Sequence, residues 1–187
     1  MNSPTLIELE AGLDAIRQAP KDRGVLEMIV RRPRAGEREV LEEGQLDLAD
    51  GLVGDNWKTR GSRTTDGSAY RETQITVMNS RVIALLAQAK ERWPLAGDQL
   101  FIDLDLSKEN LPPGTRLTFG SAVLEVTPPP HTGCKKFMAR FGQEAMAFVN
   151  SPTGKQLQLR GINAKVVQPG VIRVGAVAKK LLLSKAT

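Results

Sequence analysis

Apolar residues near the N-terminus recur at the three- and four-residue spacing of a helix that buries one face. The spaced positions are Leu6, Leu9, Leu13 and Ile16. A Ser3-Pro4 pair precedes them, which is typical of a helix start, and Pro20 would stop the helix. We therefore predict a helix over residues 4–18.

Strands are predicted where apolar residues cluster or alternate with polar ones. The stretches are residues 25–32, 39–41, 73–78 and 100–106. The last of them alternates most regularly, which places Asp103 and Asp105 on an outer face. A solvated strand edge explains these two acids better than acid–base chemistry does.

A second helix is predicted between the two later strands. Asn79 is a favourable N-cap residue, and Val82 and Leu86 begin an apolar stripe at helical spacing. Pro94 would end this helix, so we expect it over residues 79–92. A shorter helix is expected at residues 143–149.

Two stretches of the chain repeat one pattern of turns and short strands. Residues 113–123 and 169–177 each contain a Pro-Gly turn, a short strand, a tight Gly turn and another strand. Repeated short strands separated by Gly and Pro-Gly turns indicate a barrel or a sandwich. We predict a mainly β fold, a strand-rich barrel with about three helices around it.

Length and composition place the chain among single-domain globular proteins. It has 187 residues, of which 41% are hydrophobic and 25% charged. One Cys excludes an internal disulfide and fits a reducing compartment. The sequence has no long apolar run and no signal-peptide pattern at its N-terminus, so we expect no membrane association and a cytoplasmic location.

Positive charge is concentrated towards the C-terminus. Residues 141–187 carry 7 Lys or Arg against 1 Glu, within a net charge of +5 for the chain. A basic segment of this kind suits an anionic ligand or a nucleic acid, although it is also found on ordinary solvated surfaces. Aromatic residues make up only 4% of the chain, so stacking platforms for bases are scarce. We expect a small anion rather than a nucleic acid.

The strongest candidate for chemistry is Cys134, the only Cys of the chain. It follows a strand and three prolines, residues 128–130, which predict a stiff extended arm that leaves the sheet. In an extended arm Thr132, Cys134 and Lys136 would share one face. The adjacent cations, Lys135 and Lys136, favour a reactive thiolate. The alternative is a small buried apolar side chain, which is the usual role of a free Cys.

Two loops could bring backbone atoms or arginine side chains close to a ligand. Residues 51–55, with the sequence GLVGD, allow a close backbone approach or simply form a turn. Residues 56–71 form a long polar loop that includes Arg60, Arg63 and Arg71. Clustered arginines suit a phosphate, although the loop could equally be flexible without a ligand. If it binds a phosphate, these arginines should approach the Cys134 arm.

An ordered set of segments resembles the MOSC domain, which occurs at the C-terminus of molybdenum cofactor sulfurases. The segments are residues 51–55, 72–78, 111–117, 122–127 running on to Cys134, and 170–175. The resemblance covers roughly residues 25–180 and implies a closed β-barrel like that of the pyruvate kinase barrel domain. We accordingly expect an N-terminal helical extension, residues 1–24, and a MOSC β-barrel domain, residues 25–187.

The resemblance implies that the chain binds the molybdenum cofactor. Reductases of this family ligate molybdenum through the matching Cys, so Cys134 would be both the metal ligand and the catalytic residue. A thiolate is a suitable soft donor, and the pterin dithiolene would supply the other sulfurs. The expected cofactor-binding residues are Thr132, Lys135, Lys136, Arg63, Arg71 and Asp55.

Two functions remain open on this basis. The first is an enzyme that reduces N-hydroxylated small molecules, with an electron-donor reductase as its partner. The alternative is a sulfur-carrier module that holds a persulfide on Cys134, loaded by a cysteine desulfurase, for cofactor or metal–sulfur assembly. The family is also associated with pyridoxal phosphate, through a sulfurase domain that we expect this chain to lack.

The sequence departs from the family pattern in two places. Many relatives have Gly-Glu-Asn-Leu where this chain has residues 97–100, with the sequence GDQL. The usual Pro-Arg before the Cys region is replaced by Pro130-His131. These departures concern residues expected near the cofactor.

Overall fold

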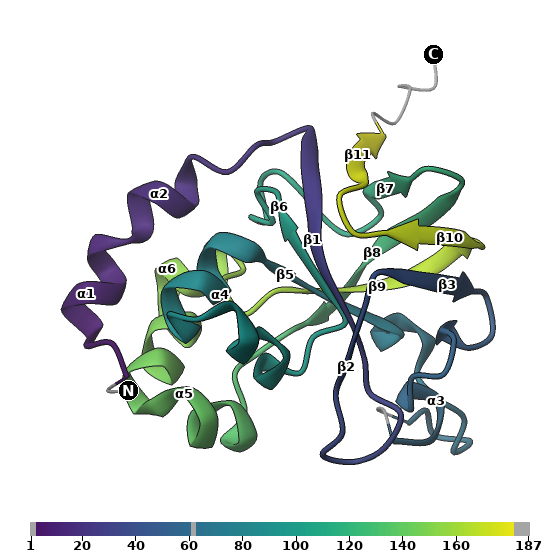
Figure 1. The fold of residues 1–187 in the computed structure, drawn as a ribbon, viewed down its shortest axis with the longest axis horizontal. Helices are drawn as coiled ribbons and strands as arrows, with labels where there is room; N and C mark the ends of the chain where they lie inside the picture. The colour runs from purple at the N-terminus through teal and green to yellow at the C-terminus, as the bar shows by residue number, and fades with distance from the viewer. Residues whose placement is uncertain (1–2, 61–62, 182–187) are drawn as a thin grey trace.

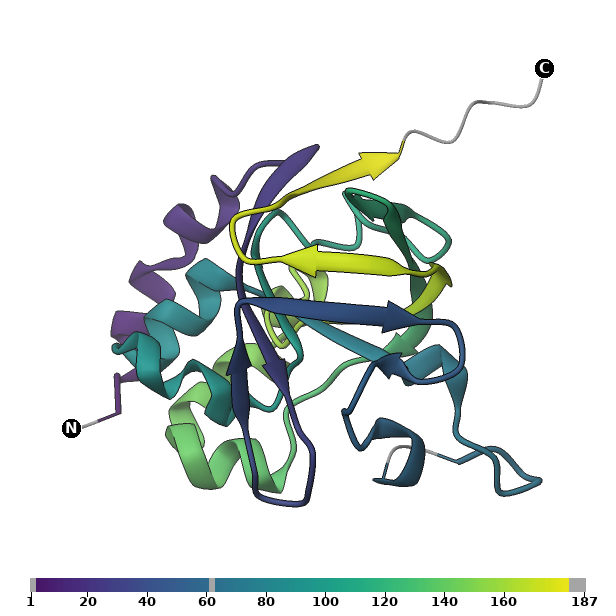
Figure 2. The same ribbon diagram turned by 45° about the vertical axis from the view of Figure 1, so that its right-hand side comes forward.

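A closed barrel of seven strands forms the centre of the computed structural model, which describes residues 3–60 and 63–181 (Figures 1 and 2). Around the barrel the strand order is β11-β7-β8-β9-β5-β6-β1, and β1 pairs with β11 to close it. All pairings are antiparallel except that between β5 and β6, which is parallel. The barrel strands are β1 (Arg23–Arg31), β5 (Ile75–Asn79), β6 (Leu100–Asp103), β7 (Arg116–Phe119), β8 (Ala122–Pro130), β9 (Ile162–Gln168) and β11 (Val177–Leu181).

A small second sheet packs against the barrel. It consists of β10 (Gly170–Arg173), β3 (Glu43–Asp47) and β4 (Gly51–Leu52), in that order. Leu46, Leu52 and Ile172 of this sheet are buried in the same apolar cluster as the barrel interior. The remaining strand, β2 (Glu39–Leu41), pairs with β1 outside the closed barrel.

Most helices lie together on one side of the barrel, to the left in Figure 1. They are α1 (Leu6–Ala11), α2 (Leu13–Arg17), α4 (Ser80–Ala87), α5 (Lys135–Asn150), α6 (Pro152–Gln156) and the 3-10 helix η2 (Lys90–Ala96). The helix α3 (Trp57–Arg60) and the 3-10 helix η1 (Arg71–Thr73) lie apart from this layer. The predicted barrel is confirmed, although the described residues form six short α-helices where about three were expected.

The barrel wall separates two apolar cores. In β1, Leu26 and Ile29 belong to the cluster inside the barrel, whereas Met28 and Val30 belong to the cluster under the helices. Successive side chains of a strand point to opposite faces, so strands on the helical side are buried on both faces. This explains Phe101, which lies between the alternating apolar residues of β6 and packs on Trp93 with ring centroids 5.9 Å apart.

The N-terminal helix is confirmed in position but is divided into α1 and α2. Gly12 separates the two parts, and a Cβ atom at this residue would lie 2.5 Å from Leu85 of α4. The close approach lets Leu9 and Ile16 enter the helical core. The predicted cap of the second helix is also confirmed, because the Asn79 side chain accepts hydrogen bonds from two backbone N–H groups of α4.

The end of that helix was predicted wrongly. The α-helix ends at Ala87, and a 3-10 helix then runs through Pro94 to Ala96. Proline is compatible with a helical turn that does not need its N–H. The strand expected at residues 100–106 ends at Asp103, whose carboxylate binds Arg81 of α4 at 2.6 Å rather than forming a solvated edge.

The predicted departure of the proline arm from the sheet is also wrong. β8 continues through the three prolines and remains beside β9, with Pro130 opposite Ile162. The ladder is interrupted between Val126 and Pro130, as expected where N–H donors are missing. Asn163 compensates by donating a side-chain hydrogen bond of 3.0 Å to the carbonyl of Pro129.

The short helix expected at residues 143–149 is the second part of a longer one. α5 begins at Lys135 and is interrupted at Gly142, which has φ of +92°. None of the helices in residues 3–60 and 63–181 is long and apolar enough to cross a membrane.

Candidate functional site

The chain from the end of β8 to the start of α5, residues 130–134, runs beside two cavities. We call the first the basic cleft; it has a volume of about 400 Å³. The second, the apolar pocket, has a volume of about 640 Å³. Four residues line both cavities: Pro130, His131, Thr132 and Asn163.

Cations from three separate elements line the basic cleft. Arg32 follows β1, Arg60 ends α3 and Lys136 is in the first turn of α5. The other lining residues are Trp57, Thr73, Thr76 and the four residues shared with the apolar pocket. The barrel thus gathers positive charge from positions that are far apart in sequence.

Asp55 holds Arg32 in place. The buried carboxylate of Asp55 accepts hydrogen bonds from Nε and Nη2 of Arg32, each at 2.8 Å, and from the backbone N–H of Trp57 at 2.9 Å. Gly54 precedes Asp55 in a turn and has φ of +81°. Glycine adopts this backbone conformation without strain because it has no Cβ atom. Asp55 was predicted to bind a cofactor; the structure places it behind the cleft, where it positions Arg32 and the start of α3.

The positive charge around the cleft exceeds the nearby negative charge. Partial burial and the charge of Arg32 lower the pKa of Arg60. Burial, followed by the charges of Arg140 and Arg32, lowers the pKa of Arg38. Arg38 and Arg140 donate side-chain hydrogen bonds to the carbonyls of neighbouring residues 94 and 95. Arginine stays protonated despite such shifts, so the cluster attracts an anion.

Cys134 is exposed at the N-cap position of α5, beside the basic cleft. Thr132 and Lys136 line the cleft, but the Cys134 side chain is not part of its wall. Because the helix begins at Lys135, the alternation expected for an extended arm stops at Cys134. Lys135 is exposed and lies outside the cleft wall. The thiol is therefore open to solvent, unlike the buried apolar Cys of the alternative interpretation.

The arginines of the long loop are divided between two places. Arg60 reaches the basic cleft, in agreement with the expected approach towards the Cys134 segment. Arg63 and Arg71 instead line a separate cavity of about 590 Å³, and Trp57 lines both that cavity and the cleft. Arg63 donates to the carbonyl of Thr59, and Arg71 donates to that of Val166 at 2.9 Å.

A buried polar group behind residues 130–134 was missed in the sequence. Nη1 of Arg160 donates to Oδ2 of Asp98 at 2.6 Å, and its guanidinium lies 4.8 Å from the ring centroid of Phe137. Nδ1 of His131 lies 3.3 Å from Oδ1 of Asp98. The available signal was the GDQL sequence at residues 97–100, where this chain departs from the family pattern.

Stability should fall in acid because of His131. Burial, together with the charge of Arg160, lowers the pKa of His131 from 6.5 to about 3. Between these pH values the unfolded chain binds more protons than the folded one, so unfolding becomes easier as the pH falls. Urea titrations from pH 7 to 3 should show a loss of roughly 4 kcal/mol attributable to this residue.

The His131→Gln variant isolates this effect, because glutamine does not titrate. Its free energy of unfolding should depend less on pH over the same range than that of the wild type. Parallel pH profiles for the two proteins would contradict the assignment to His131.

The closed mixed barrel with a helical layer and a cation-lined cleft beside an exposed Cys defines a recognisable class of protein. The MOSC domain family matches residues 58–179, and the chain belongs to this family. The family is linked to molybdenum cofactor binding. No protein with a curated description matches the chain in sequence.

Solved structures with the same fold agree with this assignment. The YuaD protein from Bacillus subtilis has a TM-score of 0.63 and 18% identity, covering 87% of this chain and 97% of that one. YiiM from Escherichia coli has a TM-score of 0.54 and 19% identity, covering 86% and 71%. YiiM from Geobacillus stearothermophilus has a TM-score of 0.56 and 14% identity, covering 87% and 77%. At these identities the likeness concerns the fold.

Proposed function

We propose that the chain binds the molybdenum cofactor at the basic cleft, with Cys134 as the protein ligand of molybdenum. The observation that carries the proposal is the position of the exposed thiol between Thr132 and Lys136, two residues of a cleft lined by Arg32 and Arg60. A soft thiolate suits molybdenum, and guanidinium groups suit a phosphate. The family membership of the chain supports the same ligand.

The residues of the cleft fit the chemical groups of this cofactor. Trp57 lines the cleft, and its buried Nε1–H has no hydrogen-bond partner within the described residues. This group offers a donor for a pterin, whereas Nδ1 of His131 faces Asp98 at 3.3 Å. No group of three or more His, Cys, Asp and Glu side chains in the described residues could hold a metal ion. One protein thiolate therefore suits a metal whose other ligands come with its own cofactor.

The proposed activity is the reduction of N-hydroxylated small molecules, with electrons from a partner reductase. The cofactor, when bound, would supply the two-electron redox centre. Arg60 and Lys136 would hold its phosphate, and Asp55 would keep Arg32 oriented through their paired hydrogen bonds. Cys134 would hold the metal at the edge of the cleft. Because Cys134 is exposed to solvent, a substrate could reach a metal bound there.

The test is analysis of molybdenum and pterin in protein purified from a molybdenum-replete host. The Arg60→Met/Lys136→Met variant should retain less than about a tenth of the wild-type pterin, because both cations of the proposed phosphate site are lost. Lys135→Met is the matched control, since Lys135 is also an exposed lysine of α5 but does not line the cleft. Equal pterin contents in the double variant and the control would refute the proposed site.

A sulfur-carrier function is favoured by one observation, the exposure of Cys134 outside the cleft wall. A partner protein could reach such a thiol directly. The thiolate of Cys134 would attack the outer sulfur of a persulfide on a cysteine desulfurase, forming a Cys134 persulfide and releasing the thiolate of the donor. Incubation with a loaded desulfurase, followed by mass spectrometry, should then detect one added sulfur atom on Cys134. An unmodified thiol would exclude this second function.

A further inference from the structure

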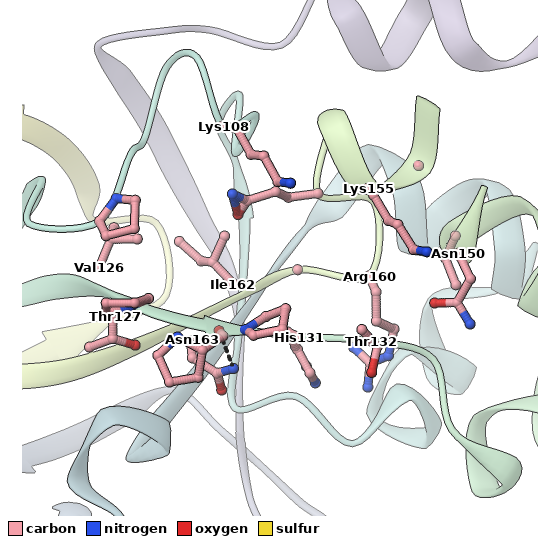
Figure 3. A pocket seen from close by; sticks show the side chains of 18 residues that line it. Lys108, Val126, Thr127, His131, Thr132, Asn150, Lys155, Arg160, Ile162 and Asn163 are labelled. Atoms are coloured by element: carbon pink, nitrogen blue, oxygen red, sulfur yellow. Dashed lines mark hydrogen bonds between the residues drawn. The ribbon is translucent and has the colours of Figure 1, made fainter. Parts of the chain in front are cut away.

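The apolar pocket lies between the end of the barrel and the helical layer. Its walls come from β8 and β9, from the C-terminal end of α5, from α6, and from the loop residues Lys108 and Pro113 (Figure 3). Its volume of about 640 Å³ is typical of sites that bind small organic molecules. The pocket is separate from the basic cleft, with residues 130–132 and Asn163 forming the shared wall.

The interior of the pocket favours the apolar body of a ligand. Val126, Val149 and Ile162 line it together with the three prolines of β8. Proline has no N–H, so this stretch of wall presents ring carbons where a strand would normally present hydrogen-bond donors. Asn163, a polar residue of the wall, already uses its side-chain amide on the Pro129 carbonyl.

Positive charge at the pocket comes from Lys108 and Lys155. Neither lysine takes part in the salt bridges formed by residues 3–60 and 63–181. The charge of Arg160 is already neutralised by Asp98 at 2.6 Å. Of the described residues that line the pocket, none is acidic. A ligand with a single negative charge would therefore meet two uncompensated ammonium groups.

The charged groups of the pocket lie together. In Figure 3, Lys108 and Lys155 lie in the upper part of the view, and His131 and Asn163 lie below them. Nε of the buried Arg160, which also lines the cavity, has no hydrogen-bond partner within the described residues. The anionic end of a ligand would thus face the lysines, and its apolar body would lie along the proline wall.

We propose that this pocket binds an apolar organic anion, a carboxylate on a hydrophobic body, with Lys108 and Lys155 contacting the carboxylate. The binding depends on residues outside the cation cluster of the basic cleft. It would therefore occur whether or not the neighbouring cleft holds a cofactor. A carboxylate compound bound here would lie against the same residues, His131 and Thr132, that line the cleft.

Calorimetric titration with naphthoate and with its neutral amide, naphthamide, tests the proposal. The two probes share one apolar body and differ in charge. Wild-type protein should bind naphthoate about tenfold more tightly than naphthamide. The Lys108→Met/Lys155→Met variant keeps apolar stems of similar length and should lose that preference. The matched control is Lys135→Met/Lys179→Met, which removes two exposed lysines outside the pocket and should keep it.

Two further variants locate the bound probe. Pro128→Trp places a large side chain at the lined wall and should abolish the binding of both probes, with folding checked by circular dichroism. Arg60→Met/Lys136→Met alters the basic cleft and should leave naphthoate binding unchanged. Equal affinities for the two probes, a preference that survives the loss of Lys108 and Lys155, or loss of binding in the cleft variant would each overturn the proposal.

Discussion

The Cys134→Ser variant is expected to lose its bound molybdenum while keeping its fold. Serine has nearly the same size, but its hydroxyl is a hard donor that does not replace a thiolate at a soft metal. Cys134 is exposed and makes no side-chain capping bond to α5, so the substitution removes no side-chain hydrogen bond, and serine is itself a favourable N-cap residue. The molybdenum content of protein from a molybdenum-replete host should therefore fall to background, with a urea midpoint no lower than that of the wild type.

Two comparisons make this result specific. Cys134→Ala should lose molybdenum to the same extent, because the missing thiolate is the cause in both variants. Met138→Leu removes an exposed sulfur one helical turn further along α5 and should retain wild-type molybdenum. If the serine variant held as much molybdenum as wild-type protein, Cys134 would not be the molybdenum ligand.

The Arg160→Met variant should lose about 3–5 kcal/mol of stability, because it leaves the Asp98 carboxylate buried without its cationic partner. The side chains of Arg160 and Asp98 are 6% and 0% exposed, so solvent cannot replace the lost contact. The Nη2 bond of Arg160 to the carbonyl of Ala96 is also lost. Urea unfolding at pH 7 measures the change.

A surface pair provides the control for this effect. Arg173 and Glu43 form an ion pair whose side chains are 67% and 51% exposed, so Arg173→Met should cost less than about 1 kcal/mol. The Arg160→Met/Asp98→Leu double variant removes both buried charges and should recover part of the loss. A single Arg160→Met variant as stable as Arg173→Met would contradict the role given to the buried pair.

The sequence was sufficient for the barrel because its strands are short and strongly patterned. A Pro-Gly turn precedes β7 and another begins β10, a Gly turn then separates β7 from β8 and β10 from β11, and apolar residues of these strands enter one core. Element ends were less predictable. The division at Gly12 depends on contact with Leu85 of α4, and the end of β6 depends on Arg81 binding Asp103. Both are tertiary contacts that local propensity does not encode.

The candidate site was predictable only where its residues are close together in the sequence. Cys134 and Lys136 follow a distinctive proline run, so the sequence was enough to single out this segment, which lies beside the basic cleft. Asp98 and Arg160 are separated by 62 residues, and no local sequence pattern predicts that they form an ion pair. Arg32 was not recognised either, because it enters the cleft from the end of β1 and is fixed there by Asp55.

The three prolines of β8 have a further consequence for assembly. A strand with an interrupted ladder normally presents free N–H groups that can recruit a strand from another molecule, which is a route to aggregation. Between Val126 and Pro130 the ladder to β9 is interrupted, yet residues 128–130 have no N–H group to offer. The apolar pocket can thus lie beside the interrupted part of the β8–β9 ladder, while residues 128–130 offer no N–H groups that could pair with a strand of another molecule. Replacing these prolines would restore the donors, and with them the tendency to self-associate.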